Sequence, residues 1–168
     1  MTSNHAHKGR PYIDPDIWYA RLPTAHIATG ALITDPAGHV LLVKPNYRDH
    51  WLLPGGWADH NEPPEAACAR EITEELGLDL PIGRLLVTDW APAYGKRPRP
   101  IAYYLFDAGT ISDPAQIRAH DSELTGHDFF PADRAERLLD PATADRLPAA
   151  VTARNTGISI YLPQKGIR

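Results

Sequence analysis

The sequence of 168 residues contains one cysteine, Cys68, and no run of apolar residues long enough to cross a bilayer. A single cysteine excludes a disulfide within the chain and any zinc site built from several thiolates. A basic excess is also missing, because 17 Lys and Arg stand against 21 Asp and Glu, giving a formal net charge of -4. This balance argues against a chain that coats nucleic acid polymers or an anionic membrane, so neither is an expected partner.

The first ten residues are polar and lack the apolar segment of a secretory signal. Together with the lone thiol, this favours a cytoplasmic protein. His5 and His7 are assigned to a terminal tail and not to a metal site, since no other ligand lies near them in the sequence. The length predicts one domain with a full hydrophobic core.

Proline is frequent, with 17 residues, so most of the chain should consist of turns, strands and short helices. Alternating and continuous apolar runs predict an α+β (α/β) unit. The predicted strands are 26–35, 39–44, 83–90, 101–106, 128–130 and 158–162, and the predicted helices are 62–77, 134–139 and 142–153.

The segment 62–77 is the most persuasive helix. Asn61 or Glu62 is a candidate cap, prolines occupy the first turn, and Gly77 suits a left-handed end. At about 100° per residue, one face carries the apolar residues Ala66, Ala69, Ile72 and Leu76. The same spacing places three carboxylates on a stripe roughly opposite that face: Glu71, Glu74 and Glu75.

These three carboxylates repel one another and lie near the helix C-terminus, where the helix dipole disfavours anions. A solvated acidic face is one interpretation of the pattern. The other is a site for a divalent cation, because Mg²⁺ takes oxygen ligands and a rigid helix can supply several together. The flanking residues favour the second interpretation.

Those flanks follow a fixed pattern: Gly56, five residues, Glu62, seven residues, and then the run Arg70-Glu71-Ile72-Thr73-Glu74-Glu75-Leu76-Gly77-Leu78. The pattern resembles the Nudix box, with every fixed position filled. By this resemblance, we expect an α/β/α sandwich around a mixed central sheet, with a loop–helix–loop metal site. The resemblance covers about residues 24–140, so we expect an N-terminal extension at 1–23, partly disordered. A C-terminal helix and tail at 141–168 should pack on the same domain.

The resemblance implies roles for individual residues. Glu71, Glu74 and Glu75, with the backbone carbonyl of Gly55, would bind Mg²⁺ or Mn²⁺. Arg70 would hold Glu71 through a salt bridge, and Glu62 would support the loop or reach the metal through water. Because a family member often takes its general base from a later loop, Glu123 and Asp121 are candidates; a plain solvated acid is the alternative for both.

The loop after the box carries the only dense basic patch, formed by Lys96, Arg97 and Arg99. These side chains could bind phosphates, or could simply solvate a loop tip. Tyr94 in this loop and Trp57 in the box could contact substrate, although packing is an equal alternative for Trp57. Pro92 resembles a marker of ADP-ribose pyrophosphatases, whereas Tyr94 resembles one of dinucleoside polyphosphate hydrolases.

The resemblance therefore implies a divalent-metal-dependent hydrolase that cleaves the pyrophosphate bond of a nucleoside diphosphate linked to another group. ADP-ribose or a similar nucleotide sugar is slightly preferred. A MutT-like nucleoside triphosphate pyrophosphohydrolase and a non-catalytic nucleotide sensor are the alternatives; an isoprenoid diphosphate isomerase is disfavoured, since its box deviates from this pattern. A homodimer is a possible assembly, which the sequence does not decide.

Overall fold

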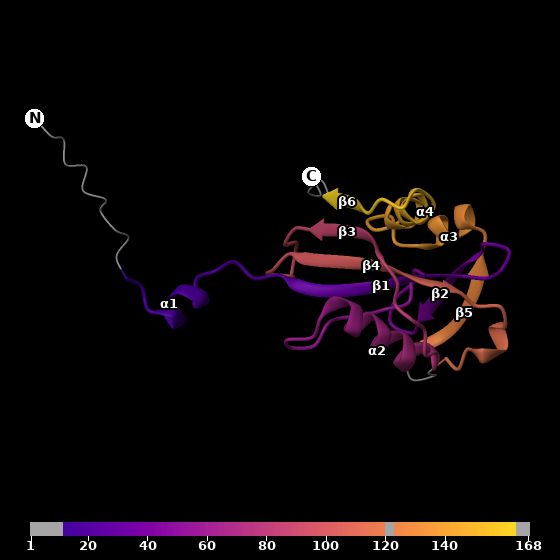
Figure 1. Cartoon of the computed structure of the whole chain (residues 1–168), viewed down its shortest axis with the longest axis horizontal. Helices are drawn as coiled ribbons and strands as arrows, with labels where there is room; N and C mark the ends of the chain where they lie inside the picture. Colours follow the sequence, from indigo (N-terminus) through magenta and orange to yellow (C-terminus); the bar gives the residue numbers. More distant parts are fainter. Residues whose placement is uncertain (1–11, 120–122, 164–168) are drawn as a thin grey trace, which may run out of the picture.

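The computed structural model describes residues 12–119 and 123–163, so His5, His7 and Asp121 lie outside the described residues. Six strands form one sheet in the order β5-β2-β1-β4-β3-β6 (Figure 1). Their bounds are β1 (His26–Thr34), β2 (Val40–Pro45), β3 (Leu85–Ala91), β4 (Ile101–Thr110), β5 (Leu124–Phe130) and β6 (Ile160–Pro163). The pairs β1–β4 and β3–β6 are parallel and the others antiparallel, which confirms the expected mixed sheet.

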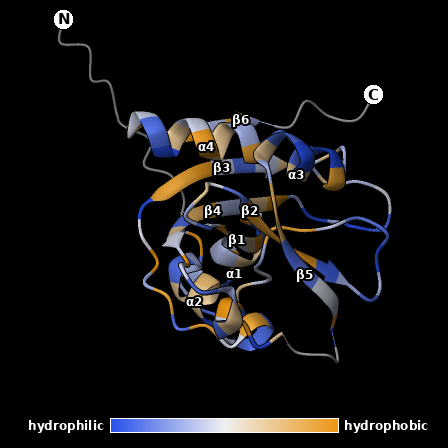
Figure 2. Ribbon diagram, turned by 90° about the vertical axis from the view of Figure 1, so that its right-hand side faces the viewer, coloured by the Kyte–Doolittle hydropathy of each residue, from blue (hydrophilic) through white to orange (hydrophobic). Residues whose placement is uncertain are grey.

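Helices cover both faces of this sheet (Figures 1 and 2). On one side lies α2 (Pro64–Leu76), and on the other lie α3 (Ala132–Leu138) and α4 (Arg146–Thr156). Neighbouring residues of a strand point to opposite faces. Ile33 and Leu41 therefore join the core under α2, whereas Leu32 and Leu42 join the core under α4. The expected α/β/α sandwich is confirmed.

The C-terminal end of α2 matches the sequence prediction, and its N-terminal cap does not. Gly77 ends the helix with φ of +65°, and its N–H donates to the Thr73 carbonyl at 2.9 Å. The prediction of Asn61 or Glu62 as the cap was wrong, because Pro63 takes that position without a side-chain hydrogen bond. The Glu62 carboxylate instead accepts hydrogen bonds from the Arg70 guanidinium.

The buried face of α2 is also rotated from the predicted one. Four residues of the helix are buried: Ala67, Cys68, Ile72 and Leu76. Ala66 is exposed and Ala69 only half-buried, so the prediction that they face the core was wrong. With Cys68 in the core, Glu71 and Glu75 border the buried face and do not lie opposite to it. This rotation takes part of the acidic stripe out of solvent.

Several elements have bounds that differ from those their patterns suggested. Strand β4 continues to Thr110, and β5 starts at Leu124, because their backbones remain paired through polar residues that break the apolar alternation. The helix α4 starts at Arg146 and not at residue 142, after a turn at 141–145. A short 3₁₀ helix, η1 (Pro114–Gln116), was not predicted.

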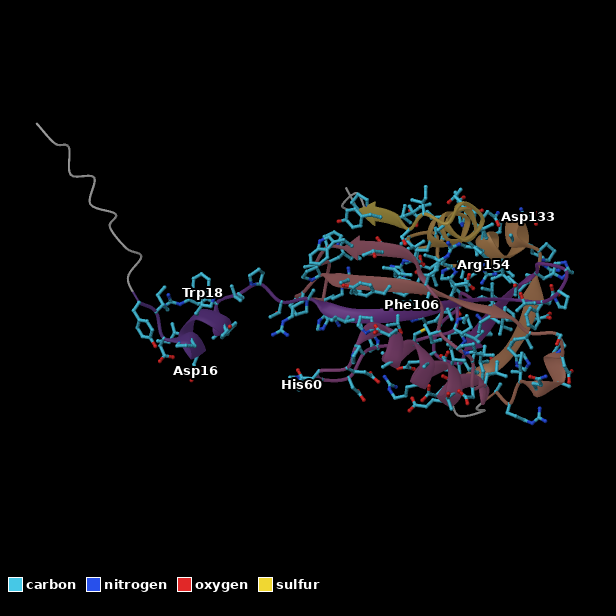
Figure 3. The ribbon with its side chains drawn as sticks, in the orientation of Figure 1. Asp16, Trp18, His60, Phe106, Asp133 and Arg154 are labelled. Atoms are coloured by element: carbon cyan, nitrogen blue, oxygen red, sulfur yellow. The ribbon has the colours of Figure 1, made fainter. Side chains whose placement is uncertain are left out.

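The N-terminal extension contains α1 (Pro15–Ala20), which was not predicted either. Asp14 caps it by accepting a hydrogen bond from the Asp16 N–H at 3.0 Å. None of its residues is buried, and the segment stands away from the sheet (Figures 1 and 3). No helix within the described residues is long and apolar enough to span a membrane.

Two ion pairs hold α4 to the sheet. Arg154 contacts Asp107 at 2.6 Å and also donates to the Leu32 carbonyl on β1 at 2.5 Å. Arg146 contacts Asp89 on β3 at 2.6 Å. Each carboxylate comes from an inner strand and each guanidinium from the helix, so α4 has a fixed position over β3 and β4.

Candidate functional site

The box loop runs beside β1, which brings its glycines against α2. The Ala31 N–H donates to the Pro54 carbonyl at 2.9 Å, and the Thr29 N–H to the Gly56 carbonyl at 2.8 Å. Gly55 has φ of +135°, and a Cβ there would lie 2.4 Å from the Thr29 carbonyl oxygen. A Cβ on Gly56 would lie 2.4 Å from the Glu71 carboxyl carbon. Glycine at residue 55 therefore lets the loop lie against the β1 backbone, and glycine at residue 56 leaves room for the Glu71 carboxylate.

The box carboxylates differ in their burial. Glu75 accepts a hydrogen bond from the Gly55 N–H at 2.9 Å, and burial, with smaller contributions from Glu71 and Glu123, raises its pKa to about 7. Burial also raises the pKa of Glu71 above its ordinary value. Glu74 is 60% exposed and faces Arg70. Glu71 and Glu75 are thus acids whose charge the protein compensates only in part.

Arg70 joins the loop and the helix. Its Nε and Nη2 donate to the two oxygens of Glu62 at 3.0 and 2.9 Å, and Nη2 also donates to the Trp57 carbonyl at 2.9 Å. Its Nη1 donates to Glu71 at 3.1 Å and to Glu74 at 2.9 Å. These hydrogen bonds lower the pKa of Glu62 and raise that of Arg70. The contact with Glu71 is the one that the resemblance implied.

A cavity of about 350 Å³ opens over these residues, and we call it the carboxylate cavity. Its lining includes Gly55, Glu71, Glu74, Glu75 and Glu123. Glu123, the residue just before β5, therefore lies in the same cavity as the box glutamates. A general base must lie this near the metal site, so the position is compatible with that predicted role.

The donors of this cavity fit a hard divalent cation, because they are carboxylate oxygens whose buried members lack a full counter-charge. Within residues 12–119 and 123–163, no three His, Cys, Asp or Glu side chains already enclose one point as metal ligands would. Glu71 and Glu74 each accept a hydrogen bond from Arg70 through one carboxylate oxygen.

A second cavity of about 470 Å³ adjoins the first, and both are lined by Ala28, Arg48 and Trp57. We call it the arginine cavity, after three of its lining residues: Arg48, Arg97 and Arg146. Tyr94, Ala91, Ile101, Asp140, Ala142 and Thr143 complete its lining. Two neighbouring compartments can hold the two parts of an elongated substrate.

The predicted substrate residues are distributed unevenly around these cavities. Trp57 lines both, and Tyr94 and Arg97 line the arginine cavity. Lys96 lines a third cavity of about 340 Å³ with Trp57 and Arg97. Arg99 is exposed and is absent from the linings of these three cavities.

Sequence reasoning missed Arg48 and Arg146 as cavity residues and Asp89 as a buried acid. Arg48 lies in a loop with no apolar pattern, and Arg146 begins a helix whose start was misplaced. Asp89 was hidden inside a strand pattern, although a charged residue in an otherwise uncharged, mostly buried strand is a signal of a buried partner.

Cys68 carries no chemistry in this arrangement. The side chain is buried, its thiol donates to the Gly30 carbonyl at 3.4 Å, and burial raises the pKa of the thiol to about 12. A neutral, buried thiol is a poor nucleophile and a poor metal ligand.

Comparison with known proteins gives consistent matches. The sequence model of the NUDIX domain matches residues 24–150. The Bacillus subtilis protein YjhB, provisionally named as an ADP-ribose pyrophosphatase, is 33% identical over 100 residues, which is 59% of this chain and 47% of that protein. The 8-oxo-dGTP diphosphatase of Proteus vulgaris is 39% identical over 67 residues, 38% of this chain and 59% of that protein. Both matches span less than two thirds of the relative's own length.

Among solved structures, the MutT NUDIX hydrolase of Burkholderia pseudomallei has a TM-score of 0.63 and is 28% identical, covering 75% of this chain and 98% of that one. The box, the sandwich and the family match over 24–150 agree with one another. This chain belongs to the Nudix hydrolase family.

Proposed function

We propose that the protein is a divalent-metal-dependent hydrolase that cleaves the pyrophosphate bond of a nucleoside diphosphate linked to another group. The observation that carries the proposal is the carboxylate cavity, in which four glutamates from α2 and the start of β5 line one space: Glu71, Glu74, Glu75 and Glu123. A diphosphate is repelled from such a surface unless a cation lies between them. The similarity to named pyrophosphohydrolases supports the same function.

In this proposal, Glu71, Glu74 and Glu75, with the Gly55 carbonyl, hold Mg²⁺ or Mn²⁺. The bound cation would neutralise the diphosphate and lower the pKa of a coordinated water. Arg70 orients Glu71 and Glu74 and keeps the box loop against the helix. Glu123, exposed and next to the same cavity, takes the proton of the attacking water.

The arginine cavity receives the rest of the substrate, with Trp57 and Tyr94 as flat contacts and Arg97 as a cationic one. Lys96 and Arg99 extend the positive surface of the loop beyond it. We prefer ADP-ribose or a similar nucleotide sugar as substrate. The provisional name of the Bacillus subtilis relative supports this choice, and the name of the Proteus vulgaris relative supports a nucleoside triphosphate as the second candidate.

The experiment is a panel of ADP-ribose, dinucleoside polyphosphates, dNTPs and oxidised dNTPs with Mg²⁺, scored by release of phosphate or nucleoside monophosphate. We expect metal-dependent release, greatest from a nucleotide sugar. Release of pyrophosphate from triphosphates alone would replace that substrate with the MutT-like alternative. If no compound is cleaved with Mg²⁺ or Mn²⁺, a nucleotide sensor is the better description.

We also propose that the chain acts in the cytoplasm as a homodimer in which α1 docks on a second copy. Trp18 on α1 is 45% exposed, and Asp16 gives this segment a negative charge (Figure 3). The third cavity offers the complementary positive charge through Lys96 and Arg97. His26 also lines this cavity and is the first residue of β1, the strand that follows the α1 segment. Light scattering should show a dimer that Trp18→Asp converts to a monomer; equal masses for the two proteins would rule the docking out.

A further inference from the structure

A row of directly paired residues on three strands lies beside the arginine cavity, and Ala28 is the member of the row that lines it. Asp89 on β3 is opposite Tyr103 on β4, and Tyr103 is in turn paired with Ala28 on β1. Ala28 bridges to Trp57 in the box loop. Paired residues of neighbouring strands present their side chains on the same face of a sheet. This row therefore runs from Trp57 and Ala28, which line both cavities, across the sheet to Asp89, which Arg146 at the start of α4 contacts.

Arg146, the first residue of α4, stands over the far end of that row. Its guanidinium carbon lies 3.9 Å from the centre of the Tyr103 ring, so one face of the guanidinium is covered. Its Nε and Nη2 donate to the Asp89 Oδ2 at 2.8 and 2.6 Å. The side chain is 12% exposed and lines the cavity, so the part that Tyr103 and Asp89 leave open faces the ligand space.

Asp89 differs from the other acids near the cavities in its near-complete burial, at 1% exposed. Its Oδ1 is buried and makes no hydrogen bond to the described part of the chain. At 2.6 Å its charge cancels that of Arg146. Arg146 therefore offers the cavity a flat face and N–H donors with little net charge.

Within residues 12–119 and 123–163, the other two arginines of the cavity have no carboxylate paired with them as Arg146 has. Arg48 lines both cavities and so lies at the boundary between them, where the diphosphate would pass. Arg97 donates through Nη2 to the Pro92 carbonyl at 2.5 Å, while its Nε is buried without a partner among the described residues. Positive charge is thus concentrated toward the boundary and the loop. At the other end Asp89 cancels the charge of Arg146, and Asp140 in the same lining adds a negative charge.

We propose that the Arg146 end of the arginine cavity binds the uncharged nucleobase of the substrate, and that Asp89 is a positioning residue that makes this end prefer a base over a further phosphate. A guanidinium stacks on flat rings and donates to their ring nitrogen and carbonyl acceptors. A phosphate instead requires net positive charge, which Asp89 removes. This inference rests on the proposed function, because it takes the diphosphate to lie over the glutamates.

The test measures binding to the full-length protein without metal, so that no turnover occurs. Isothermal titration compares AMP, GMP, CMP and UMP with ribose 5-phosphate, which has the same phosphate and sugar but no base. At least one nucleoside monophosphate should bind about 10-fold or more tightly than ribose 5-phosphate. If none does, the Arg146 end is not a base site.

Variants then assign the difference to Arg146. Replacing Arg146 alone leaves Asp89 buried and unpaired, which threatens folding, so the decisive variant is Asp89→Asn with Arg146→Leu. This double variant should bind the nucleoside monophosphates no better than ribose 5-phosphate, with its fold checked by circular dichroism. An unchanged advantage for the base would overturn the proposal, and so would an equal loss for both ligands, which is the result for a phosphate site.

The role of Asp89 is tested separately, by the binding of ribose 5-phosphate and by its dependence on salt. In Asp89→Asn the guanidinium regains its full charge, so ribose 5-phosphate should bind more tightly and with a steeper dependence on salt, while the advantage of the base shrinks. A purely structural Asp89 would weaken all ligands together without this change in salt dependence. If the protein binds the base but hydrolyses no compound of the substrate panel, the proposed function is wrong and the nucleobase site stands. If it hydrolyses the panel but binds no base, the nucleobase site is wrong and the proposed function stands.

Discussion

Two buried acidic sites in this protein differ in where their counter-charge comes from. Asp89 lies under α4 with Arg146 at 2.6 Å, so its counter-charge is part of the chain. Glu75 on α2 receives one backbone N–H from Gly55 and stands near two other acids, Glu71 and Glu123. A buried carboxylate needs a partner, and Asp89 has an ion-pair partner within the chain, although burial still raises its pKa. Glu75 has no such partner, and in our proposal a cation from solution supplies it.

The difference shows how a fold can separate recognition from chemistry. A site with an internal counter-ion has a fixed shape and little net charge, which suits the binding of an uncharged ring. A site with uncompensated carboxylates has stability to gain from a metal ion, and the metal then serves the reaction. Arg70 gives partial compensation to Glu71 and Glu74, and its contacts do not extend to Glu75.

The largest expected effect comes from the uncompensated site. Glu75→Gln should lower turnover at least about 100-fold, because it removes a metal ligand and its charge. Folding should be unharmed, since the change removes a buried charge that lacks an ion-pair partner. Steady-state kinetics with Mg²⁺ and a thermal melt measure the two quantities. Glu65→Gln, an exposed position in the first turn of the same helix, is the matched control; comparable losses in both variants would contradict the assignment.

The compensated site should show its effect in stability. Arg146→Ala leaves Asp89 without its partner, and we expect the free energy of unfolding to fall by about 3–5 kcal/mol. Adding Asp89→Asn to Arg146→Leu removes both charges, so much of that loss should return. Urea denaturation followed by circular dichroism measures both proteins. A double variant less stable than Arg146→Ala would mean that packing, and not charge pairing, dominates at this position.

Stability should depend on pH and on metal at the uncompensated site. Folding raises the pKa of Glu75 from its ordinary 4.5 to about 7, so its protonated form is favoured in the native state. The contribution of this group is therefore fully present below about pH 4.5 and is lost as the pH rises through about 7. Without metal, the melting temperature should fall between pH 5.5 and pH 8.

Mg²⁺ binds the ionised carboxylates and should stabilise the protein more at pH 8 than at pH 5.5. At a hundredfold excess over the dissociation constant, binding contributes about 2.7 kcal/mol. Differential scanning calorimetry at the two pH values, with and without the ion, gives the comparison. An equal gain at both pH values would show that Glu75 is not the group that titrates.

An acid on the surface should show the smallest effect. Asp133 contacts Arg137 at 3.0 Å, but both side chains are about 70% exposed, at 71% and 69% (Figure 3 labels Asp133). Solvent screens such a pair, so Asp133→Ala should leave the free energy of unfolding almost unchanged, in contrast to Arg146→Ala. A larger change, measured by urea denaturation, would undermine the argument that burial separates the three sites.

The sequence predicted the box helix, its glycine end and the main strands, because each depends on local signals: periodic apolar residues, prolines and glycines. The sandwich was expected from the resemblance to the Nudix family. It placed the acidic stripe opposite the core, since Ala66 and Ala69 are apolar in type. The structure buries Cys68 and Ala67 instead, because the contact with the sheet decides which small residues are covered.

The compensated site could not be predicted in the same way. Asp89 and Arg146 are far apart in sequence, and they meet only because α4 crosses β3 and β4. The pairing of Asp89 with Tyr103 depends on strand register, which no local pattern determined. Glu123, by contrast, was found from its place before a predicted strand, and the structure brings it to the carboxylate cavity.

The central claim is that a divalent cation enters only the uncompensated acidic site. Titration of Mn²⁺ into the protein, with free Mn²⁺ counted by its paramagnetic resonance signal, tests it most directly. The wild type and Asp89→Asn should bind the ion equally, whereas Glu71→Gln with Glu75→Gln should bind none at the same concentrations. Undiminished binding in that double variant, or loss of binding in Asp89→Asn, would contradict the account.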